Sequence, residues 1–482
     1  MTLTDLTPQR VWSHFYALTK VPRPSHKEEQ VVAFMKKFGE DLGLETIVAE
    51  KGNVIIRKPA TPGMEERCGI ILQSHLDMVL MPKDHDLTKE PIQPRIDGEW
   101  MHATGTTLGA DNGLGVAATM AVLEAKDLEH GPIEALFTTT EEVGMEGARA
   151  LKGGLLQGSI LINLDSEEEG DLYVGCAGGV NGNFTFTYQE EAVPEDMLPY
   201  SLTVEGLRGG HSGLEIHRYR GSANKLMMRL LLPVMTQYGV RLASIDGGSY
   251  RNAIPSKASA IIMVPKDKVA EVEANINAVA ALAQAELSIA DPNLQVVLAA
   301  NPVTPDFVID APTALSAVRA VFGAFSGVYR MSDAMPGLVE TSSNIGIVKS
   351  EDGKIEIICL TRSSVDSAKE ELADMLAATF TLAGASIEFT TGYGGWQPNL
   401  NSPILLKMKE VYKNMYGVEP QVKAIHAGLE CGILAKNYPQ WDMISCGPTL
   451  LSPHSAEERV KISTVEKWWN FLVEVLKNAP AR

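Results

Sequence analysis

Two residues able to do chemistry end an apolar run early in the chain. The run Gly69-Ile-Ile-Leu-Gln-Ser leads directly into His75-Leu-Asp77, which is typical of a short buried strand with a polar site at its end. Residues i and i+2 of an extended chain point to the same side, so His75 and Asp77 share a face. A carboxylate beside an imidazole fixes the tautomer and orientation of the ring, an arrangement common behind metal-ligating histidines.

Acidic residues end three more predicted elements. Asp111 lies in Gly109-Ala-Asp-Asn-Gly at the start of an expected helix, where backbone N–H groups and the helix dipole favour a carboxylate. Expected strands over 133–140 and 160–164 end at Glu141-Glu142 and at Asp165. A second histidine, His454, follows Ser452-Pro near the end of the chain. The candidate set is His75, Asp77, Asp111, Glu141, Glu142, Asp165 and His454.

These acids together predict a metal site. Several carboxylates in one cleft repel one another unless cations or protons intervene, and two divalent metal ions sharing a bridging carboxylate would resolve the repulsion. Nitrogen and oxygen ligands without thiolate suit Zn²⁺, Mn²⁺ or Co²⁺. Glu141 and Glu142 point to opposite sides if the strand stays extended, so one can bind metal while the other serves as a general base. The pattern alone does not say which is which.

The elements that must position this set indicate an α/β fold. Strands alternate with helices over the first part of the chain, which predicts a mostly parallel, helix-covered sheet. A polar, proline-bearing stretch around 188–199 and the segment Gly392-Tyr-Gly-Gly-Trp mark two boundaries. We therefore expect a catalytic domain in two parts, residues 1–188 and 393–482, interrupted by an inserted α/β lid domain of two similar halves over 189–392.

Bulk properties narrow the classes of function. The chain has 482 residues, 45% of them hydrophobic, enough for more than one core, and its net charge of −18 disfavours nucleic acid. The five cysteines form no C-x-x-C pair, which predicts reduced thiols. We find neither a signal-peptide pattern nor an apolar run long enough to span a bilayer, so we expect a cytoplasmic protein without membrane contact.

The motifs resemble a known family. Ser74-His75-Leu-Asp77, Gly109-Ala-Asp111-Asn-Gly, Thr140-Glu141-Glu142-Val-Gly, Asn163-Leu-Asp165 and Ser452-Pro-His454-Ser are similar to those of the di-zinc aminoacylase/carboxypeptidase metallopeptidase superfamily. The closest resemblance is to the aminoacyl-histidine dipeptidases, also called cytosol non-specific dipeptidases or peptidase D. It extends along the whole chain and implies a di-metal domain with a lid.

The resemblance also implies a role for each site residue. His75 and Asp165 would complete one metal site, Glu142 and His454 the other, and Asp111 would bridge them. Asp77 would orient His75, and Glu141 would be the general base. In the lid, His211 with Asn252 would polarise the scissile carbonyl, and Arg362 would bind the substrate's α-carboxylate. Glu430 is the expected partner of its α-ammonium.

The expected function is metal-dependent hydrolysis of dipeptides with free termini, with a broad specificity that includes Xaa-His. The resemblance implies zinc, with cobalt or manganese as alternatives. An N-acyl amino-acid deacylase or a tripeptidase would share the metal set, and a non-catalytic peptide- or metal-binding protein is the alternative from another class. The presence of Glu141 argues against the last. Smaller relatives often pair through the lid, so a homodimer is a further expectation.

Overall fold

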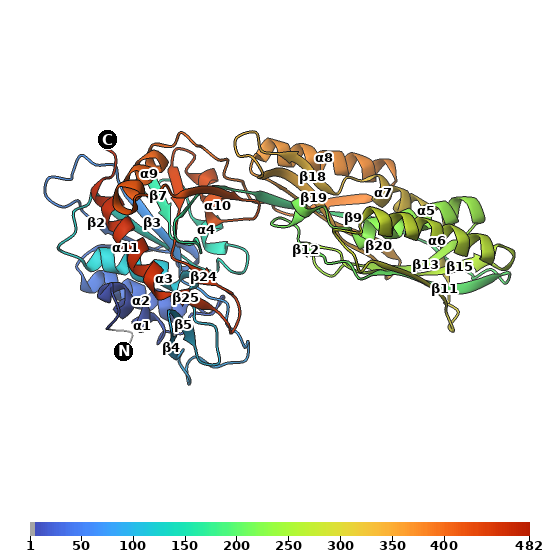
Figure 1. Ribbon diagram of the computed structural model, residues 1–482, viewed down its shortest axis with the longest axis horizontal. Coiled ribbons are helices and arrows are strands. Elements are labelled where there is room, and N and C mark those ends of the chain that lie inside the picture. Colours follow the sequence, from blue (N-terminus) through green and yellow to red (C-terminus); the bar gives the residue numbers. More distant parts are fainter. Residues whose placement is uncertain (1–4) are drawn as a thin grey trace. The chain divides into compact units, whose positions relative to one another are not determined.

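The computed structural model describes residues 5–482 and contains two compact units (Figure 1). The first unit comprises the chain up to Gly175 together with Trp396–Ala424 and Leu429–Arg482. The inserted unit comprises Cys176–Gly395 and the short segment Ile425–Gly428. The described chain therefore leaves the first unit and returns to it, as a split domain requires.

An eight-stranded sheet forms the centre of the first unit. The strand order is β1 (Glu45–Val48), β2 (Val54–Lys58), β6 (Ile133–Thr138), β3 (Ile70–His75), β7 (Ile160–Asn163), β23 (Asp442–Ser445), β8 (Asp171–Cys176) and β22 (Gln421–Ile425). The four central strands β6, β3, β7 and β23 are parallel, whereas β2 and β8 join them antiparallel. Every residue of β3 and β6 is buried, which is why both strands read as continuous apolar runs.

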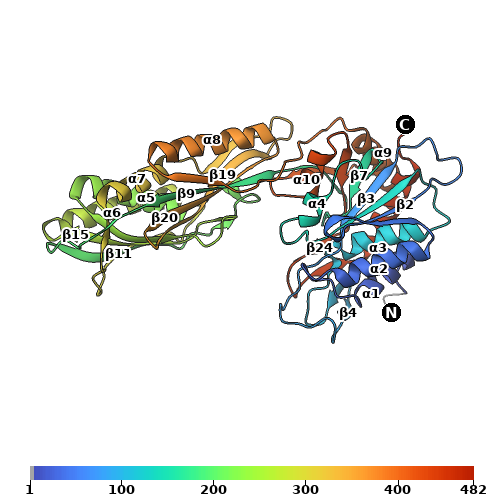
Figure 2. The same cartoon turned by 180° about the vertical axis from the view of Figure 1, so that it is seen from behind.

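Helices cover this sheet. They are α1 (Gln9–Leu18), α2 (Glu29–Asp41), α3 (Ala110–Glu124), α4 (Glu146–Ala150), α9 (Pro403–Tyr416), α10 (Glu430–Asn437) and α11 (Ile462–Lys477). Helix α3 contacts both β3 and α1 (Figure 2). It is buried on all sides from Asn112 to Leu123, as expected for a helix that is apolar all round. A four-stranded sheet of β24 (Leu450–Leu451), β25 (Arg459–Lys461), β5 (Trp100–Ala103) and β4 (Pro94–Asp97) completes the unit.

The inserted unit is built on a nine-stranded antiparallel sheet. Its first four strands in spatial order are β16 (Gln295–Ala300), β11 (Met197–Glu205), β15 (Ala258–Pro265) and β13 (Arg241–Gly247). The next four are β19 (Val339–Glu351), β20 (Lys354–Ser363), β9 (Gly178–Thr187) and β21 (Ser386–Phe389), and β18 (Gly327–Met331) pairs with β19. Only two residue pairs join β13 to β19, so the sheet consists of a part of four strands and a part of five strands that includes β18.

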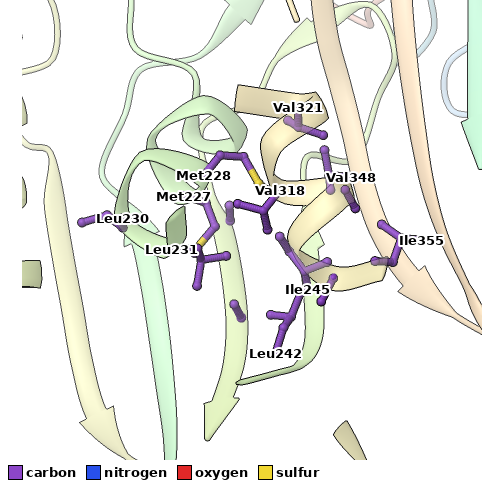
Figure 3. Close-up of a cluster of buried hydrophobic side chains, with 14 of the residues drawn as sticks. Met227, Met228, Leu230, Leu231, Leu242, Ile245, Val318, Val321, Val348 and Ile355 are labelled. Carbon is purple, nitrogen blue, oxygen red and sulfur yellow. The ribbon is translucent and has the colours of Figure 1, made fainter. Parts of the chain in front are cut away.

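Four helices lie along one face of this sheet (Figure 1). They are α5 (Ala223–Tyr238), α6 (Val269–Glu286), α7 (Ala311–Gly323) and α8 (Asp366–Leu382). The core between them and the sheet includes Met227 and Met228 of α5 and Val318 of α7, together with Ile245 and Ile355 of the strands (Figure 3). Two short pairs of strands lie outside the main sheet: β12 (Gly210–His211) with β14 (Ala253–Ile254), and β10 (Glu190–Glu191) with β17 (Val308–Ile309).

The structure divides the chain earlier than the boundary expected at residue 188. Strand β9 belongs to the inserted unit because it pairs with β20 along its whole length, from Gly178 to Thr187. The polar stretch after this strand marks the turn at its far end and not the junction between units. The second division falls after Gly395, near the expected residue 392.

Candidate metal centre

His75 and Asp77 lie at the carboxyl end of β3, one of the two inner strands of the parallel set. Both side chains are buried, and His75 Nδ1 is 3.5 Å from Asp77 Oδ1 and 3.1 Å from the Asp77 carbonyl oxygen. The Asp77 carboxylate also accepts the backbone N–H groups of Glu141 at 2.9 Å and Glu142 at 3.2 Å. One carboxylate thus contacts the histidine ring and holds the turn after β6.

Asp111 lies between the two histidines. Its Oδ1 is 3.1 Å from His75 Nε2, and its Oδ2 is 3.1 Å from His454 Nε2. Asp165 Oδ1 is 3.2 Å from His75 Nε2, and Glu142 Oε2 is 2.9 Å from His454 Nε2. The side chains therefore form two groups, each with one histidine and one carboxylate of its own, that share Asp111.

Within each group the ligand atoms lie within 4.8 Å of one another. A third such group consists of His75, Glu141 and Glu142. All six residues, like Asp77, come from the candidate set, which the fold collects from the ends of separate strands and helices. Open α/β sheets bind their ligands outside the carboxyl ends of the strands, and the centre has this location.

The carboxylates create a strongly negative field at both imidazoles. Burial alone would lower the pKa of His75, but Asp165, Asp111 and Asp77 outweigh burial and raise that pKa well above its usual range. Hydrogen bonds with Asp111 and then Glu142 raise the pKa of His454 to about 11. This field attracts positive charge, which either a proton or a metal ion can supply.

Two acids of the centre, Glu141 and Asp165, have raised pKa values. Burial raises the pKa of Glu141 well above its ordinary value, against the opposing effect of His75. Burial likewise raises the pKa of Asp165 to about 6. A carboxyl group with a raised pKa is better suited to accept and return a proton than an ordinary surface carboxylate.

The side chains present fit divalent metal ions. Glu142 Oε1 is buried and has no hydrogen-bond partner among the described residues, so it offers a free oxygen ligand. The three groups contain only imidazole nitrogen and carboxylate oxygen, and none of the five cysteines takes part. Such a donor set, which contains no thiolate, suits borderline and hard cations.

Glu430 lies at the start of α10 and is only 1% exposed. Its Oε2 accepts hydrogen bonds from Thr138 Oγ1 at 2.8 Å and from Gln73 Nε2 at 2.5 Å. Burial raises its pKa to about 7. The carboxylate therefore braces the ends of β3 and β6, and a contact with the substrate's ammonium remains a prediction.

His211 and Asn252 are neighbours within the inserted unit. The Ser212 backbone N–H donates to the Asn252 carbonyl at 2.8 Å, next to the pairing of β12 with β14. His211 Nδ1 accepts the backbone N–H groups of Gly213 at 3.2 Å and Leu214 at 3.0 Å. Since a backbone N–H can only donate, Nδ1 is unprotonated and the ring carries its proton on Nε2.

Arg362 lies on β20 of the same unit and is 5% exposed. Its Nη1 donates to the Tyr393 hydroxyl at 3.1 Å, and its Nε has no hydrogen-bond partner among the described residues. Burial and then the charge of Arg362 lower the pKa of His211. His211 is therefore neutral and lies in the positive field of a guanidinium.

Comparison with known proteins identifies the family. The model of peptidase family M20/M25/M40 matches residues 71–478. The chain belongs to this peptidase family. It is 44% identical to the cytosol non-specific dipeptidase of Escherichia coli (strain K12), over 100% of this chain and 99% of the relative. The resemblance inferred from the motifs is confirmed.

Solved structures agree in fold. The aminoacylhistidine dipeptidase of Vibrio alginolyticus is 41% identical and superimposes with a TM-score of 0.94, covering 100% of this chain and 99% of that one. The aminopeptidase PepT of Bacillus cereus shares the fold at 16% identity and a TM-score of 0.58, covering 98% and 99%. No helix within residues 5–482 is both long and apolar enough to cross a membrane.

Sequence reasoning missed several residues that support the site. Ser25 Oγ donates to Asp77 Oδ2 at 2.8 Å, and Glu28 Oε1 accepts from Thr140 Oγ1 at 2.7 Å. Both come from the segment between α1 and α2. No local pattern marks them, because their partners lie far away along the chain.

Proposed function

We propose that the protein is a di-metal dipeptidase that hydrolyses dipeptides with free termini, Xaa-His among them. The observation that carries the proposal is the pair of ligand groups that share Asp111, one with His75 and Asp165 and the other with Glu142 and His454. A chain 44% identical along its whole length to a protein named as a dipeptidase supports the substrate class. Zinc and a count of two ions per chain belong to this proposal.

The metal ions, when bound, would polarise the peptide carbonyl and make a water molecule more acidic. Glu141 takes a proton from the water as its oxygen attacks the carbonyl carbon. As the C–N bond breaks, Glu141 returns that proton to the leaving amine nitrogen. Asp77 keeps the His75 ring in place throughout, because it contacts Nδ1 on the side opposite the ligand nitrogen.

His211 is proposed to donate a hydrogen bond from its Nε2–H to the carbonyl oxygen of the substrate as negative charge develops there. The tautomer supports this role, since Nδ1 already accepts two backbone N–H groups. Asn252 is the proposed second donor to the same oxygen. His211→Gln should lower kcat by about 10²–10³-fold, the usual cost of removing one such donor, while metal affinity stays unchanged.

The two ends of the substrate are assigned to different side chains. The Arg362 guanidinium is proposed to bind the α-carboxylate, with Nε free to take part. Glu430 is the proposed partner of the α-ammonium. If Glu430 contacts the ammonium, Glu430→Gln should raise KM for dipeptides; if it only braces the strands, the variant should lose stability without changing KM.

A metal and substrate panel tests the whole proposal. Chelator-treated protein should lose cleavage of Xaa-His dipeptides and regain it with Zn²⁺, Mn²⁺ or Co²⁺, and elemental analysis should give two ions per chain. Dipeptides should react well, whereas tripeptides and N-acetyl amino acids should react poorly. Full activity in verified metal-free protein, or a preference for N-acetyl substrates, would refute the proposal.

Location and assembly complete the proposal. The relative from Escherichia coli is named a cytosol dipeptidase, which supports a cytoplasmic location, and the net charge of −18 makes a nucleic-acid partner unfavourable. We propose a homodimer, and light scattering at several concentrations tests it by comparing the measured mass with that of one chain.

A further inference from the structure

A buried carboxylate, Glu458, holds the backbone that carries the shared ligand Asp111. Glu458 is 2% exposed and lies four residues after His454. Its Oε2 accepts the backbone N–H of Gly109 at 2.8 Å, and its Oε1 accepts those of Ala110 at 2.8 Å and Asp111 at 3.1 Å. One side chain thus binds three successive backbone donors where α3 begins.

A buried guanidinium holds the same backbone from the other side. Arg23, also 2% exposed, donates from Nη2 to the carbonyl oxygen of Gly109. Its Nη1 donates to the carbonyl oxygens of Leu76 and Asp77, at 3.0 Å each. Arg23 therefore ties the segment after His75 to the segment that carries Asp111.

Gly109 has to be glycine for this arrangement. Its φ of +68° is a conformation that side chains rarely adopt, and a Cβ atom would lie 2.7 Å from Arg23 Nη2 and 2.9 Å from the sulfur of Met78. The guanidinium approaches the backbone in the space that a side chain would need. Glycine at position 109 therefore permits the close contact between Arg23 and this backbone.

Burying the charges of Arg23 and Glu458 is unfavourable in free energy unless each charge is compensated. A buried ion without a partner of opposite sign is strongly unfavourable, and Arg23 and Glu458 each contact several backbone dipoles. They also contact the same residue, because Arg23 donates to the carbonyl oxygen of Gly109 and Glu458 accepts its N–H. Their charges therefore compensate each other across one short segment of chain.

We propose that Arg23 and Glu458 are positioning residues that fix the three segments carrying His75, Asp111 and His454, and so set the affinity of the centre for both metal ions. The inference rests on the proposed dinuclear site, in which Asp111 belongs to both ligand groups. A displacement of Asp111 weakens both ions together.

Glu458→Gln is the primary test. The amide keeps one acceptor oxygen but turns a donor toward a backbone N–H, so at least one of the three contacts is lost. The matched control is Glu134→Gln in the same unit. Glu134 is also buried, accepts the N–H groups of Gln157 at 2.7 Å and Gly158 at 2.8 Å, and pairs with Arg57, but at the opposite end of β6.

The readout is Zn²⁺ affinity of the metal-free full-length proteins, measured by competition with a chromogenic chelator, together with Tm. We expect Glu458→Gln to weaken binding of both ions by about 10–100-fold, the usual effect of losing a residue that orients metal ligands. Glu134→Gln should lower Tm without changing affinity. Wild-type affinity in Glu458→Gln, or an equal loss in Glu134→Gln, would overturn the inference.

Arg23→Lys is the alternative test variant if Glu458→Gln does not fold. Lysine keeps the charge but cannot bind three carbonyl groups in a planar fork, so the same loss of affinity is expected, and unchanged affinity would overturn the inference. The proposed function fails separately, because it requires the wild-type protein itself to bind two ions.

Discussion

At the scale of single residues, two adjacent glutamates differ in their surroundings. Glu142 Oε2 lies 2.9 Å from His454 and belongs to a ligand group with Asp111. The Glu141 carboxylate is grouped with His75 and Glu142 and has a pKa raised by burial. The turn that carries both glutamates is held by Asp77, which accepts both of their backbone N–H groups.

Glu141→Gln should retain metal and lose turnover. The amide has nearly the same shape but cannot accept a proton, so kcat should fall by about 10²–10⁴-fold. Zn²⁺ affinity should stay near that of the wild type. Glu146→Gln is a suitable control, because Glu146 is near in sequence but its side chain pairs with Lys51 at 3.0 Å on the exposed surface. Near-normal turnover in Glu141→Gln would show that another group is the base.

His426 gives the inserted unit a pH-dependent stability. The side chain is 5% exposed, and its Nε2 is 2.7 Å from Ser342 Oγ. Burial, reinforced by Arg362, His211 and His217, lowers the pKa of His426 from 6.5 to about 3. Between these two values the unfolded chain binds a proton that the folded chain does not, so stability falls as pH falls from 6.5 toward 3.

Urea unfolding at pH 7 and pH 5 tests this effect. The wild type should lose on the order of 2 kcal/mol between the two values on account of this residue, since one pKa unit corresponds to about 1.4 kcal/mol. His426→Asn should be less stable at pH 7 but lose less on acidification. An identical loss in both proteins would assign the acid sensitivity to other groups.

At the scale of elements, the geometry of the centre depends on the turn at the end of each strand. Thr140 has a φ of +52°, which is uncommon for a β-branched residue and persists only where the surroundings enforce it. Its hydroxyl donates to Glu28, and the next two N–H groups donate to Asp77. The chain therefore leaves the extended conformation immediately before Glu141.

The cap of α7 provides a test of stability confined to one element. Asp310 Oδ1 accepts the Thr313 N–H at 2.9 Å, and Oδ2 accepts the Gln189 N–H at 2.8 Å. Asp310→Ala should lower the free energy of unfolding by about 1–2 kcal/mol and leave Zn²⁺ affinity unchanged. Ser402→Ala, which removes the corresponding cap of α9 in the first unit, is the matched variant. A loss of metal affinity in Asp310→Ala would contradict this separation.

At the scale of the whole molecule, the two units have separate cores. The proposed metal ligands all belong to the first unit, whereas His211, Asn252 and Arg362 belong to the inserted unit. A ligand stabilises the part of the protein that binds it, and local opening is measured segment by segment through hydrogen exchange.

Metal binding should therefore slow hydrogen exchange in the first unit only. Zn²⁺ added to metal-free protein should protect the segments 109–113 and 140–145, where the backbone carries or adjoins the ligands. Amides of β11 and β15 in the inserted unit should exchange at the same rate with and without metal. Equal protection in both units would show that metal binding acts on the entire molecule.

Sequence by itself determined the candidate ligands and most of the elements that end in them. Apolar runs at β3, β6 and β7 are visible because a strand buried on both faces has few polar positions. His75, the pair Glu141-Glu142 and Asp165 stand out because polar residues end these runs, whereas Asp111 stands out at the expected start of a helix. The division of the chain was harder to place, because the sequence of β9 does not show that its partner is β20 of the inserted unit.

Tertiary structure alone decided how the ligands are held. Arg23 and Glu458 are separated by most of the chain, yet both contact Gly109. Their partners are backbone groups, and every residue type offers those, so no sequence pattern records the contact. A side chain that does chemistry must be one of a few residue types, so it can be recognised in the sequence. A side chain that binds a distant backbone group can be recognised only after the fold has brought the two together.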